Sequence, residues 1–337
     1  MRVMRDLLVL KTDITEFNKL KVNRKFYQSL KVDGLVIEIF EDFSRGNIND
    51  IFFLNEYYRE VGINIVIRFD IKTLMENLID TDSSFVDFSK PNIRKSLYHF
   101  ISYLIKHGIR AFDLMGLENL SSKEKALVEA IRELNKNTFF NRKVLSMAEI
   151  SAPSKTLMAL SNPALSCLSL IRCEGEIEDI FNLSREFARA KSGLCLTLDN
   201  FPKNNINFNN YPTYARKMIL MTLFFLRASL YIEEKDMNVG DVIFLRKLFS
   251  LNKNLSKMDK IRKILPREKD ILAFIREGKG EKVLFMANLT EKEVLVDLAF
   301  KVMDYKEYEY LIGSITHRVL FKTILLRPYE AIAFIKL

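Results

Sequence analysis

The chain has 337 residues, of which 48% are hydrophobic, so it is long enough to bury one large core and a second, smaller one. Its formal net charge is +9, but acidic residues are interleaved with the basic ones along most segments, as at residues 123–125 and 267–270. This pattern is typical of solvated surfaces and not of a phosphate-binding face, so we expect no nucleic-acid partner. No run reaches the roughly 18 consecutive apolar residues of a bilayer-spanning helix, and we expect no membrane segment in this chain.

The cysteines offer no metal or redox site. Cys167, Cys173 and Cys195 form no Cys-x-x-Cys pair and lie at no spacing that is typical of metal ligands. All of them fall in apolar segments, where a thiol usually behaves as a small hydrophobic group. We therefore expect no metal and no cofactor, and the sequence leaves open whether any of these cysteines pair.

From the N-terminus, short apolar runs alternate with amphipathic stretches about eight times before residue 262, which predicts βα units on a parallel sheet. Gly62 and Gly108 follow two of the amphipathic stretches directly, where a left-handed helix cap favours glycine. Eight such units predict a closed (β/α)8 TIM barrel. The expected strands are 7–11, 34–39, 63–69, 109–114, 144–148, 167–171, 194–198 and 229–232, and the clearest helices are 51–58, 93–105, 126–134, 177–188 and 214–226.

Beyond the barrel the apolar period changes to two. A polar, lysine-rich helix is expected over 244–263, and Gly278-Lys-Gly280 is typical of a hairpin turn between two strands. The pattern predicts two domains, a barrel over 1–262 and a small antiparallel β-domain over 267–337. The expected strands of the second domain are 271–276, 282–288, 294–298 and 332–336.

Several segments resemble the α-amylase and oligo-glucosidase family. Residues 270–277, 282–290 and 326–334 are similar to the closing β-domain of that family, and residues 104–115 are similar to its passage into barrel strand four. The resemblance implies a TIM barrel followed by a small antiparallel β-domain. Active members of the family carry a long insert after strand three, but here only about twenty residues separate strand 63–69 from the next helix, so we expect no insert.

One branch of the family is more similar than the sugar-cleaving enzymes. Residues 26–36 and 111–120 resemble the ectodomain of the heavy subunit of heteromeric amino-acid transporters. This resemblance implies a catalytically inactive binding or chaperone subunit whose partner is a membrane transporter light chain. Those heavy subunits have a membrane helix before the barrel and a linking cysteine, and this sequence shows neither. An extracellular location at the plasma membrane is expected if an anchor has been trimmed, and a soluble cytoplasmic one otherwise.

The resemblance also locates the positions at which the family carries its catalytic groups. Retaining glycoside hydrolysis needs two carboxylates that flank the scissile bond. The strand-five glutamate is preserved as Glu149, whereas the strand-four Arg-x-Asp is matched by Asp113-Leu-Met115. The remaining matched positions are Phe201 and Pro202 at strand seven, in place of His-Asp, and Arg68 and Lys72-Thr73 at strand three. With the nucleophile and the second acid replaced, the resemblance implies that the chain is not an enzyme.

Two alternatives remain open. In the first, the chain is a divergent α-glucosidase or transglycosidase that uses Glu149 with a displaced acid, Asp113 or Asp199. In the second, it is a soluble carbohydrate-binding pseudo-enzyme. Because side chains alternate along a strand, we expect Asp113 not to replace an acid at position 115.

The other polar candidates are weak. The histidines His99, His107 and His317 have no partner at ligand or triad spacing, so surface or helix-capping roles are expected. N-glycosylation sequons begin at Asn119, Asn182, Asn254 and Asn288, and they have meaning only if the chain enters a secretory pathway.

Overall fold

The computed structural model describes residues 7–12, 23–38, 45–74, 90–116, 129, 133, 136, 144–150, 168–173, 193–197, 210–226, 229–251, 255, 258, 260–265, 268, 270–278, 280–298, 301–302, 304–315 and 319–337. The chain divides into two compact units. The first unit comprises Met1–Asn200 and Ala228–Lys235, and the second comprises Phe201–Arg227 and Asp236–Leu337.

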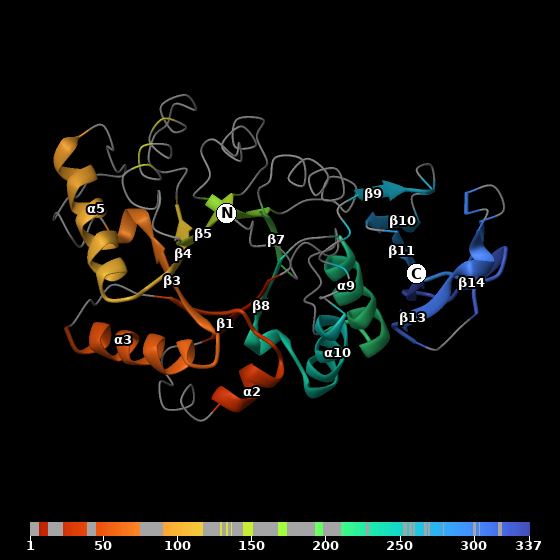
Figure 1. Cartoon of the computed structure of the whole chain (residues 1–337), viewed down its shortest axis with the longest axis horizontal. Helices are drawn as coiled ribbons and strands as arrows, with labels where there is room; N and C mark the ends of the chain where they lie inside the picture. Colours follow the sequence, from red (N-terminus) through yellow and green to blue (C-terminus); the bar gives the residue numbers. More distant parts are fainter. Residues whose placement is uncertain are drawn as a thin grey trace. The chain divides into compact units, whose positions relative to one another are not determined.

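The first unit is built on a closed barrel of eight parallel strands in the order β1 to β8 (Figure 1). The barrel closes because β1 pairs with β8, with Leu10 opposite Ile232. The predicted strands are confirmed, each within about two residues of its expected bounds, because continuous apolar runs are what a sheet covered on both faces requires. The strands are β1 (Leu8–Thr12), β2 (Gly34–Glu38), β3 (Asn64–Asp70), β4 (Ala111–Met115), β5 (Leu145–Ile150), β6 (Leu168–Cys173), β7 (Gly193–Thr197) and β8 (Ser229–Glu233).

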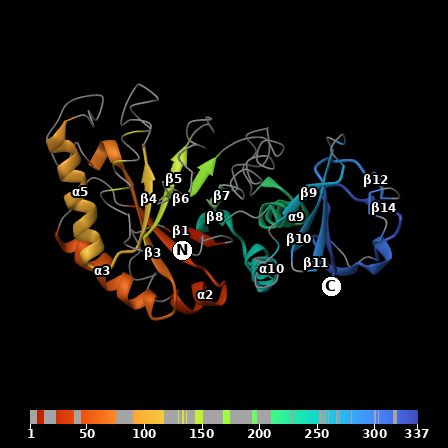
Figure 2. The same cartoon turned by 45° about the horizontal axis from the view of Figure 1, so that its top comes forward.

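Three described helices accompany these strands: α2 (Arg24–Ser29), α3 (Arg45–Arg59) and α5 (Pro91–Lys106). Figure 2 shows α3 and α5 on the outside of the strands. Gly62 and Gly108 follow α3 and α5 with φ of 81° and 89°, which confirms both as left-handed caps. β3 ends at Asp70 and α5 begins at Pro91, so no domain is inserted after strand three. The helices expected at 126–134 and 177–188 lie outside the described residues, apart from positions 129 and 133.

Apolar side chains fill the middle of the barrel. Val9, Val36, Val66, Ala111 and Tyr231, together with Met147, form one buried cluster contributed by six strands. Each is at most 3% exposed. Since side chains alternate along a strand, this layer identifies which residues of each strand share the interior face.

The second unit contains a five-stranded antiparallel sheet, in the order β13-β15-β11-β10-β9, and a two-stranded sheet of β12 and β14. The hairpin predicted at Gly278-Lys-Gly280 joins β10 to β11, with Gly278 paired to Glu281 and Gly280 at a φ of 91°. The strands are β9 (Lys260–Lys263), β10 (Ile271–Gly278), β11 (Glu281–Asn288), β12 (Val294–Asp297), β13 (Glu309–Gly313), β14 (Thr323–Leu326) and β15 (Ala331–Lys336).

The helix expected over 244–263 is wrong in its second half. α10 (Val239–Ser250) begins earlier, at an Asn238–Asp241 capping box, and ends at Ser250. Residues 260–263 instead form β9, the edge strand that pairs with β10. A four-residue edge strand with one apolar residue among three basic ones has no period-2 run long enough to predict, and pairing with β10 overrides local preference. For the same reason β13 and β14, of five and four residues, were not expected.

Helices α9 (Thr213–Phe225) and α10 belong to this second unit and pack against each other. α9 also contacts β11 and β15, and the rings of Phe225 and Phe285 stack 5.1 Å apart. These contacts explain why ten residues of α9 between Ala215 and Phe225, all except Lys217, are buried. The division into domains at residues 262 and 267 stays a prediction. No helix among the described residues is long and apolar enough to cross a membrane.

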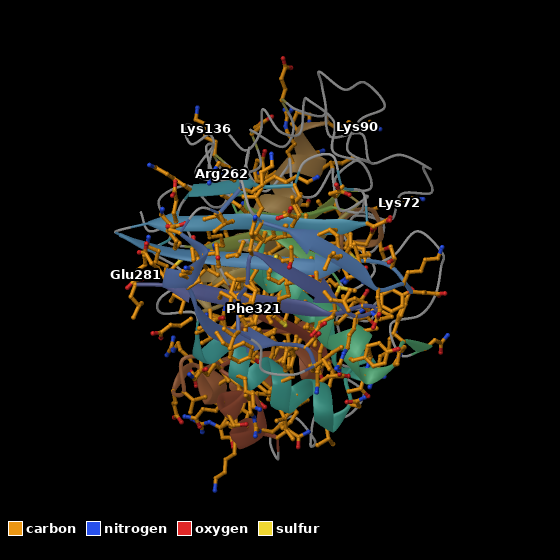
Figure 3. The ribbon with its side chains drawn as sticks, turned by 90° about the vertical axis from the view of Figure 1, so that its right-hand side faces the viewer. Lys72, Lys90, Lys136, Arg262, Glu281 and Phe321 are labelled. Atoms are coloured by element: carbon orange, nitrogen blue, oxygen red, sulfur yellow. The ribbon has the colours of Figure 1, made fainter. Side chains whose placement is uncertain are left out.

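The two-stranded sheet leaves one apolar face uncovered by the described residues. Leu295 and Leu325 lie opposite each other on β12 and β14 and are 66% and 43% exposed. Phe321, labelled in Figure 3, precedes β14 and is 64% exposed. The opposite face, with Val296 and Ile324, packs into the core of the unit.

Candidate functional site at the carboxyl end of the barrel

Ionisable side chains lie two residues beyond the apolar layer on five neighbouring strands. They are Lys11, Glu38, Arg68, Asp113 and Glu233, on β1, β2, β3, β4 and β8, and we name them the mouth cluster. Because two residues is the period of a strand, they share the face of Val9, Val36, Val66, Ala111 and Tyr231. They therefore lie at the carboxyl end of the barrel, the end at which TIM-barrel enzymes carry their active sites.

Arg68 is the centre of this cluster. Its guanidinium donates a hydrogen bond to the hydroxyl of Tyr231 at 2.7 Å and another to Sδ of Met115 at 2.7 Å. It also forms ion pairs with Glu38 at 3.6 Å and with Asp113 at 4.0 Å. Arg68 is 8% exposed and Asp113 is fully buried. An arginine suits this position because its fixed fork of donors reaches several acceptors at once.

Lys11 connects the first and last strands of the barrel. Its ammonium lies 2.9 Å from Oε2 of Glu38 and 3.4 Å from Oε1 of Glu233. Lys235 approaches Glu233 from the segment after β8, at 2.6 Å. The cations and carboxylates thus alternate around this side of the barrel, and each charge has an opposite charge beside it.

The electrostatic effects follow from these contacts. Burial lowers the pKa of Arg68, but Tyr231, Asp113 and Glu38 outweigh it, so the pKa is raised and the guanidinium stays charged. Burial raises the pKa of Glu233, but Lys235 and Lys11 outweigh it and the pKa is lowered. Nearby, Tyr27 donates to Glu234 at 2.8 Å, and burial and that carboxylate raise the pKa of Tyr27. The mouth is therefore polar and charged at neutral pH.

Strand alternation does not separate Asp113 from residue 115, and whether Asp113 can replace an acid at position 115 stays a prediction. The two positions are two residues apart on β4, so they lie on the same face, and Arg68 contacts both. A shift of one residue reverses the face of a side chain, whereas a shift of two preserves it. Asp113 lies directly opposite Arg68 in the register of β3 and β4.

The other positions matched to catalytic groups of the family lie on or after β3, β5 and β7. Glu149 lies on β5, and its backbone pairs with that of Arg172 on β6. Lys72 and Thr73 follow β3, and Thr73 donates its backbone N–H to Oδ1 of Asp70 at 2.9 Å. Asp199, Phe201 and Pro202 lie outside the described residues, so nothing tests what was expected of them.

Sequence reasoning missed Lys11, Glu38, Glu233 and Tyr231. The signal was available for Lys11 and Glu38, since each is a single charged residue at the end of an apolar strand, two residues beyond a valine. The side chain of such a residue points either into the carboxyl end of the barrel or outwards to the helices. Only the register of the paired strands decides between these two directions.

Of the remaining candidates, His107 follows α5, and its Nδ1 lies 2.9 Å from the carbonyl oxygen of Tyr103, while His99 is exposed on the same helix. Asn288 is fully buried, and its Nδ2 donates to the carbonyl oxygens of Lys292, Leu326 and Arg327. A glycan on Nδ2 would break this network. His317, Cys167 and the sequons at Asn119, Asn182 and Asn254 lie outside the described residues, as do the side chains of Cys173 and Cys195.

Among the described residues, no group of three or more His, Cys, Asp or Glu side chains is arranged to hold a metal ion. The carboxylates of the mouth cluster are instead paired with Lys11, Lys235 and Arg68.

Comparison with known proteins agrees with this architecture. Residues 261–330 match the family described as Maltogenic Amylase, C-terminal domain. No curated protein matches the sequence. Among solved structures, trehalose-6-phosphate hydrolase of Bacillus licheniformis superposes with a TM-score of 0.77 at 12% identity, over 98% of this chain and 99% of that one.

Two further enzymes share the fold. A trehalulose synthase has a TM-score of 0.75 at 10% identity, over 98% of this chain and 99% of its own. The isomaltulose synthase of Klebsiella sp. LX3 has a TM-score of 0.75 at 9% identity, over 97% and 98%. The chain thus has the fold of the α-amylase family, a TIM barrel without the insert after strand three, followed by an antiparallel β-domain.

These comparisons correct the prediction that the chain is not an enzyme. Solved structures that share its fold include a trehalose-6-phosphate hydrolase and two sugar synthases, and residues 261–330 match the C-terminal domain of maltogenic amylases. The prediction depended on assigning single positions by resemblance, and it overlooked that Asp113 shares a face and an arginine with position 115. The resemblance to the α-amylase family itself is confirmed for the fold and for the C-terminal region.

Proposed function

We propose that this chain acts on α-glucosides at the carboxyl end of its barrel, as a divergent α-glucosidase or transglycosidase. The observation that carries the proposal is the mouth cluster, in which carboxylates and cations from five strands converge at the catalytic end of the fold. The fold is shared by a trehalose-6-phosphate hydrolase, a trehalulose synthase and an isomaltulose synthase, which supports a sugar as the substrate.

In this proposal Glu149 is the general acid and base, and Asp113 is the second carboxylate. The family to which the sequence is similar has an arginine two residues before its nucleophile on strand four. Here the arginine, Arg68, lies on β3 and the acid lies opposite it on β4, so a paired arginine and aspartate occur at the same level of the barrel. An opposite charge nearby favours the charged form of a carboxylate in general, and attack on an anomeric carbon requires that form.

Met115 separates Asp113 from the mouth in this arrangement. It lies two residues nearer the carboxyl end of β4 on the same face, and it is partly exposed while Asp113 is buried. A thioether on an unbranched side chain changes rotamer readily, so displacement of Met115 by substrate would give access to Asp113.

Hydrolysis and transfer assays on nitrophenyl α-glucoside, maltose, trehalose and sucrose test the proposal. We expect turnover by the unmodified protein and its loss in Glu149→Gln and in Asp113→Asn, with Glu60→Gln as the control, since Glu60 has a side chain that is 70% exposed and paired with Arg24. Absence of both hydrolysis and transfer in the unmodified protein would refute the proposed function. Retained turnover in Asp113→Asn, with loss in Glu149→Gln, would refute only the role of Asp113.

The transporter-subunit hypothesis stays a prediction. It depends on the similarity of residues 26–36 and 111–120 to a heavy-subunit ectodomain, and neither the fold nor the comparisons support it. It requires stable association with a polytopic light chain, so co-expression with such a chain, followed by affinity purification in detergent, tests it. Recovery of the chain without a partner would refute it.

A further inference from the structure

The second unit carries a group of tyrosines that the proposed function does not use. Tyr211 lies two residues before α9, Tyr214 lies in the first turn of α9, and Tyr329 lies two residues before β15. The rings of Tyr211 and Tyr329 meet edge to face, with centroids 6.3 Å apart at 75°. The hydroxyl of Tyr329 donates to Oε1 of Glu291 at 3.3 Å. We name Tyr211, Tyr214, Tyr329 and Glu291 the tyrosine platform.

The platform combines the buried ring of Tyr211 with the exposed ring of Tyr214. Tyr211 is 8% exposed and supports Tyr329 from the side, whereas Tyr214 is 41% exposed. Burial raises the pKa of Tyr329, and the Glu291 carboxylate and the phenols of Tyr211 and Tyr214 raise it further. Burial and Glu291 likewise raise the pKa of Tyr211. The phenols of Tyr211 and Tyr329 are therefore neutral hydrogen-bond donors at neutral pH, and the hydroxyl of Tyr329 donates to the Glu291 carboxylate.

The buried ion pair of Arg216 and Asp241 supports the backbone of the platform. Arg216 on α9 donates to the carbonyl oxygen of Tyr211 at 3.3 Å and pairs with Asp241 of α10 at 3.2 Å. Arg216 is 8% exposed and Asp241 is fully buried. Burying the two charges of this ion pair costs desolvation free energy. The pair holds Arg216 in place, and Arg216 in turn binds the backbone that carries the ring of Tyr211.

Tyr329 is also held in a strained conformation. Its φ is +49°, in the left-handed region that disfavours a residue with a side chain, and the only other described non-glycine residue with positive φ is Lys31. A glycine at position 329 would remove the strain but would also remove the ring contact with Tyr211 and the hydrogen bond to Glu291. Strain of this kind persists where the surrounding structure orients a side chain for contact with a ligand.

We propose that the tyrosine platform is a binding site for an oligosaccharide, separate from the mouth cluster and outside the chemistry assigned to the barrel. The C–H face of a pyranose ring carries partial positive charge and stacks on the negative face of an aromatic ring such as Tyr214. The equatorial hydroxyls at the edge of that sugar then meet Glu291 as an acceptor and the phenols as donors. A solvent-exposed aromatic ring beside a buried one suits a flat neutral ligand. A quaternary ammonium instead requires rings on several sides of the cation.

The test uses maltoheptaose with the Glu149→Gln protein, so that no ligand is consumed. The chain has 12 tyrosines and no tryptophan, so ligand binding is followed by tyrosine absorption and fluorescence without a tryptophan signal, and the part of the change that platform variants remove is assigned to the platform. We expect Tyr214→Ala and Tyr329→Gly each to weaken the binding reported by this signal about tenfold. Tyr103→Ala is the matched control, because Tyr103 is 43% exposed on α5 of the first unit.

Tyr329→Gly is chosen because relief of the positive φ offsets part of the stability lost with the ring contact and the hydrogen bond, and thermal unfolding of the variant verifies that it is folded. Unchanged maltoheptaose binding in both platform variants, or no tyrosine signal on titration of the parent, would overturn the proposal. Displacement of the sugar by tetramethylammonium, or a change in the tyrosine signal with that cation alone, would also overturn it. The result is independent of turnover, which Glu149 and Asp113 variants report.

Discussion

Replacing Arg68 by methionine should strongly destabilise the barrel. Arg68 is buried between Glu38, Asp113 and Tyr231, and its removal takes away the cation that lies 4.0 Å from the fully buried Asp113. Removing one partner of a buried ion pair typically costs about 3–5 kcal/mol, because the remaining charge has lost its compensation. For a unit of this size each kcal/mol lowers Tm by about 2–4 °C, so a fall of about 6–20 °C is expected.

Thermal and urea unfolding of Arg68→Met, Asp113→Asn and the double variant give the energy of the pair through a double-mutant cycle. The double variant should be more stable than Arg68→Met alone, since neutralising Asp113 removes the buried charge. Tyr231→Phe serves as the control, because it deletes only the hydroxyl that accepts from Arg68 at 2.7 Å, a loss of about 1–3 kcal/mol. A loss below about 1 kcal/mol in Arg68→Met, or additive effects in the cycle, would refute this account of the mouth cluster.

Three further predictions follow from described contacts. Met115→Ala should raise the turnover of nitrophenyl α-glucoside, because Met115 lies between Asp113 and the mouth; a rate equal to that of the unmodified protein would show that Met115 does not limit access. Gly62→Ala should cost about 1–2 kcal/mol in urea unfolding, although no atom lies within 4 Å of the added Cβ, because φ is +81°; Gly62→Asn should cost less, and equal costs would argue against a backbone origin. Because the pKa of Glu233 is lowered on folding, its contribution is present above its ordinary pKa of 4.5 and is lost as the pH falls through the lower, folded value; the difference in Tm between the unmodified protein and Glu233→Gln should therefore shrink below pH 4.5, and a difference constant from pH 7 to pH 3 would contradict this.

The sequence by itself determined the eight barrel strands and the hairpin between β10 and β11. Each of these features is encoded locally, in an apolar run bounded by polar residues or in a glycine that adopts positive φ, as at Gly62 and Gly108. The common face of Asp113 and residue 115 was also available from the sequence, since it follows from the two-residue period of a strand. Edge strand β9 was not, because its four residues are ordered by pairing with β10 and not by a pattern of their own.

Only the tertiary structure decided which charges meet. Lys11 and Glu233 are separated by 222 positions in the chain, and they become neighbours because the barrel closes between β1 and β8. Arg68 reaches Asp113 because β3 and β4 pair in a register that places the two residues opposite each other. A one-residue change in either register would turn these side chains away from the interior, and nothing in the separate strand sequences specifies that register. The mouth cluster therefore depends on the closure of the whole barrel and not on any single motif.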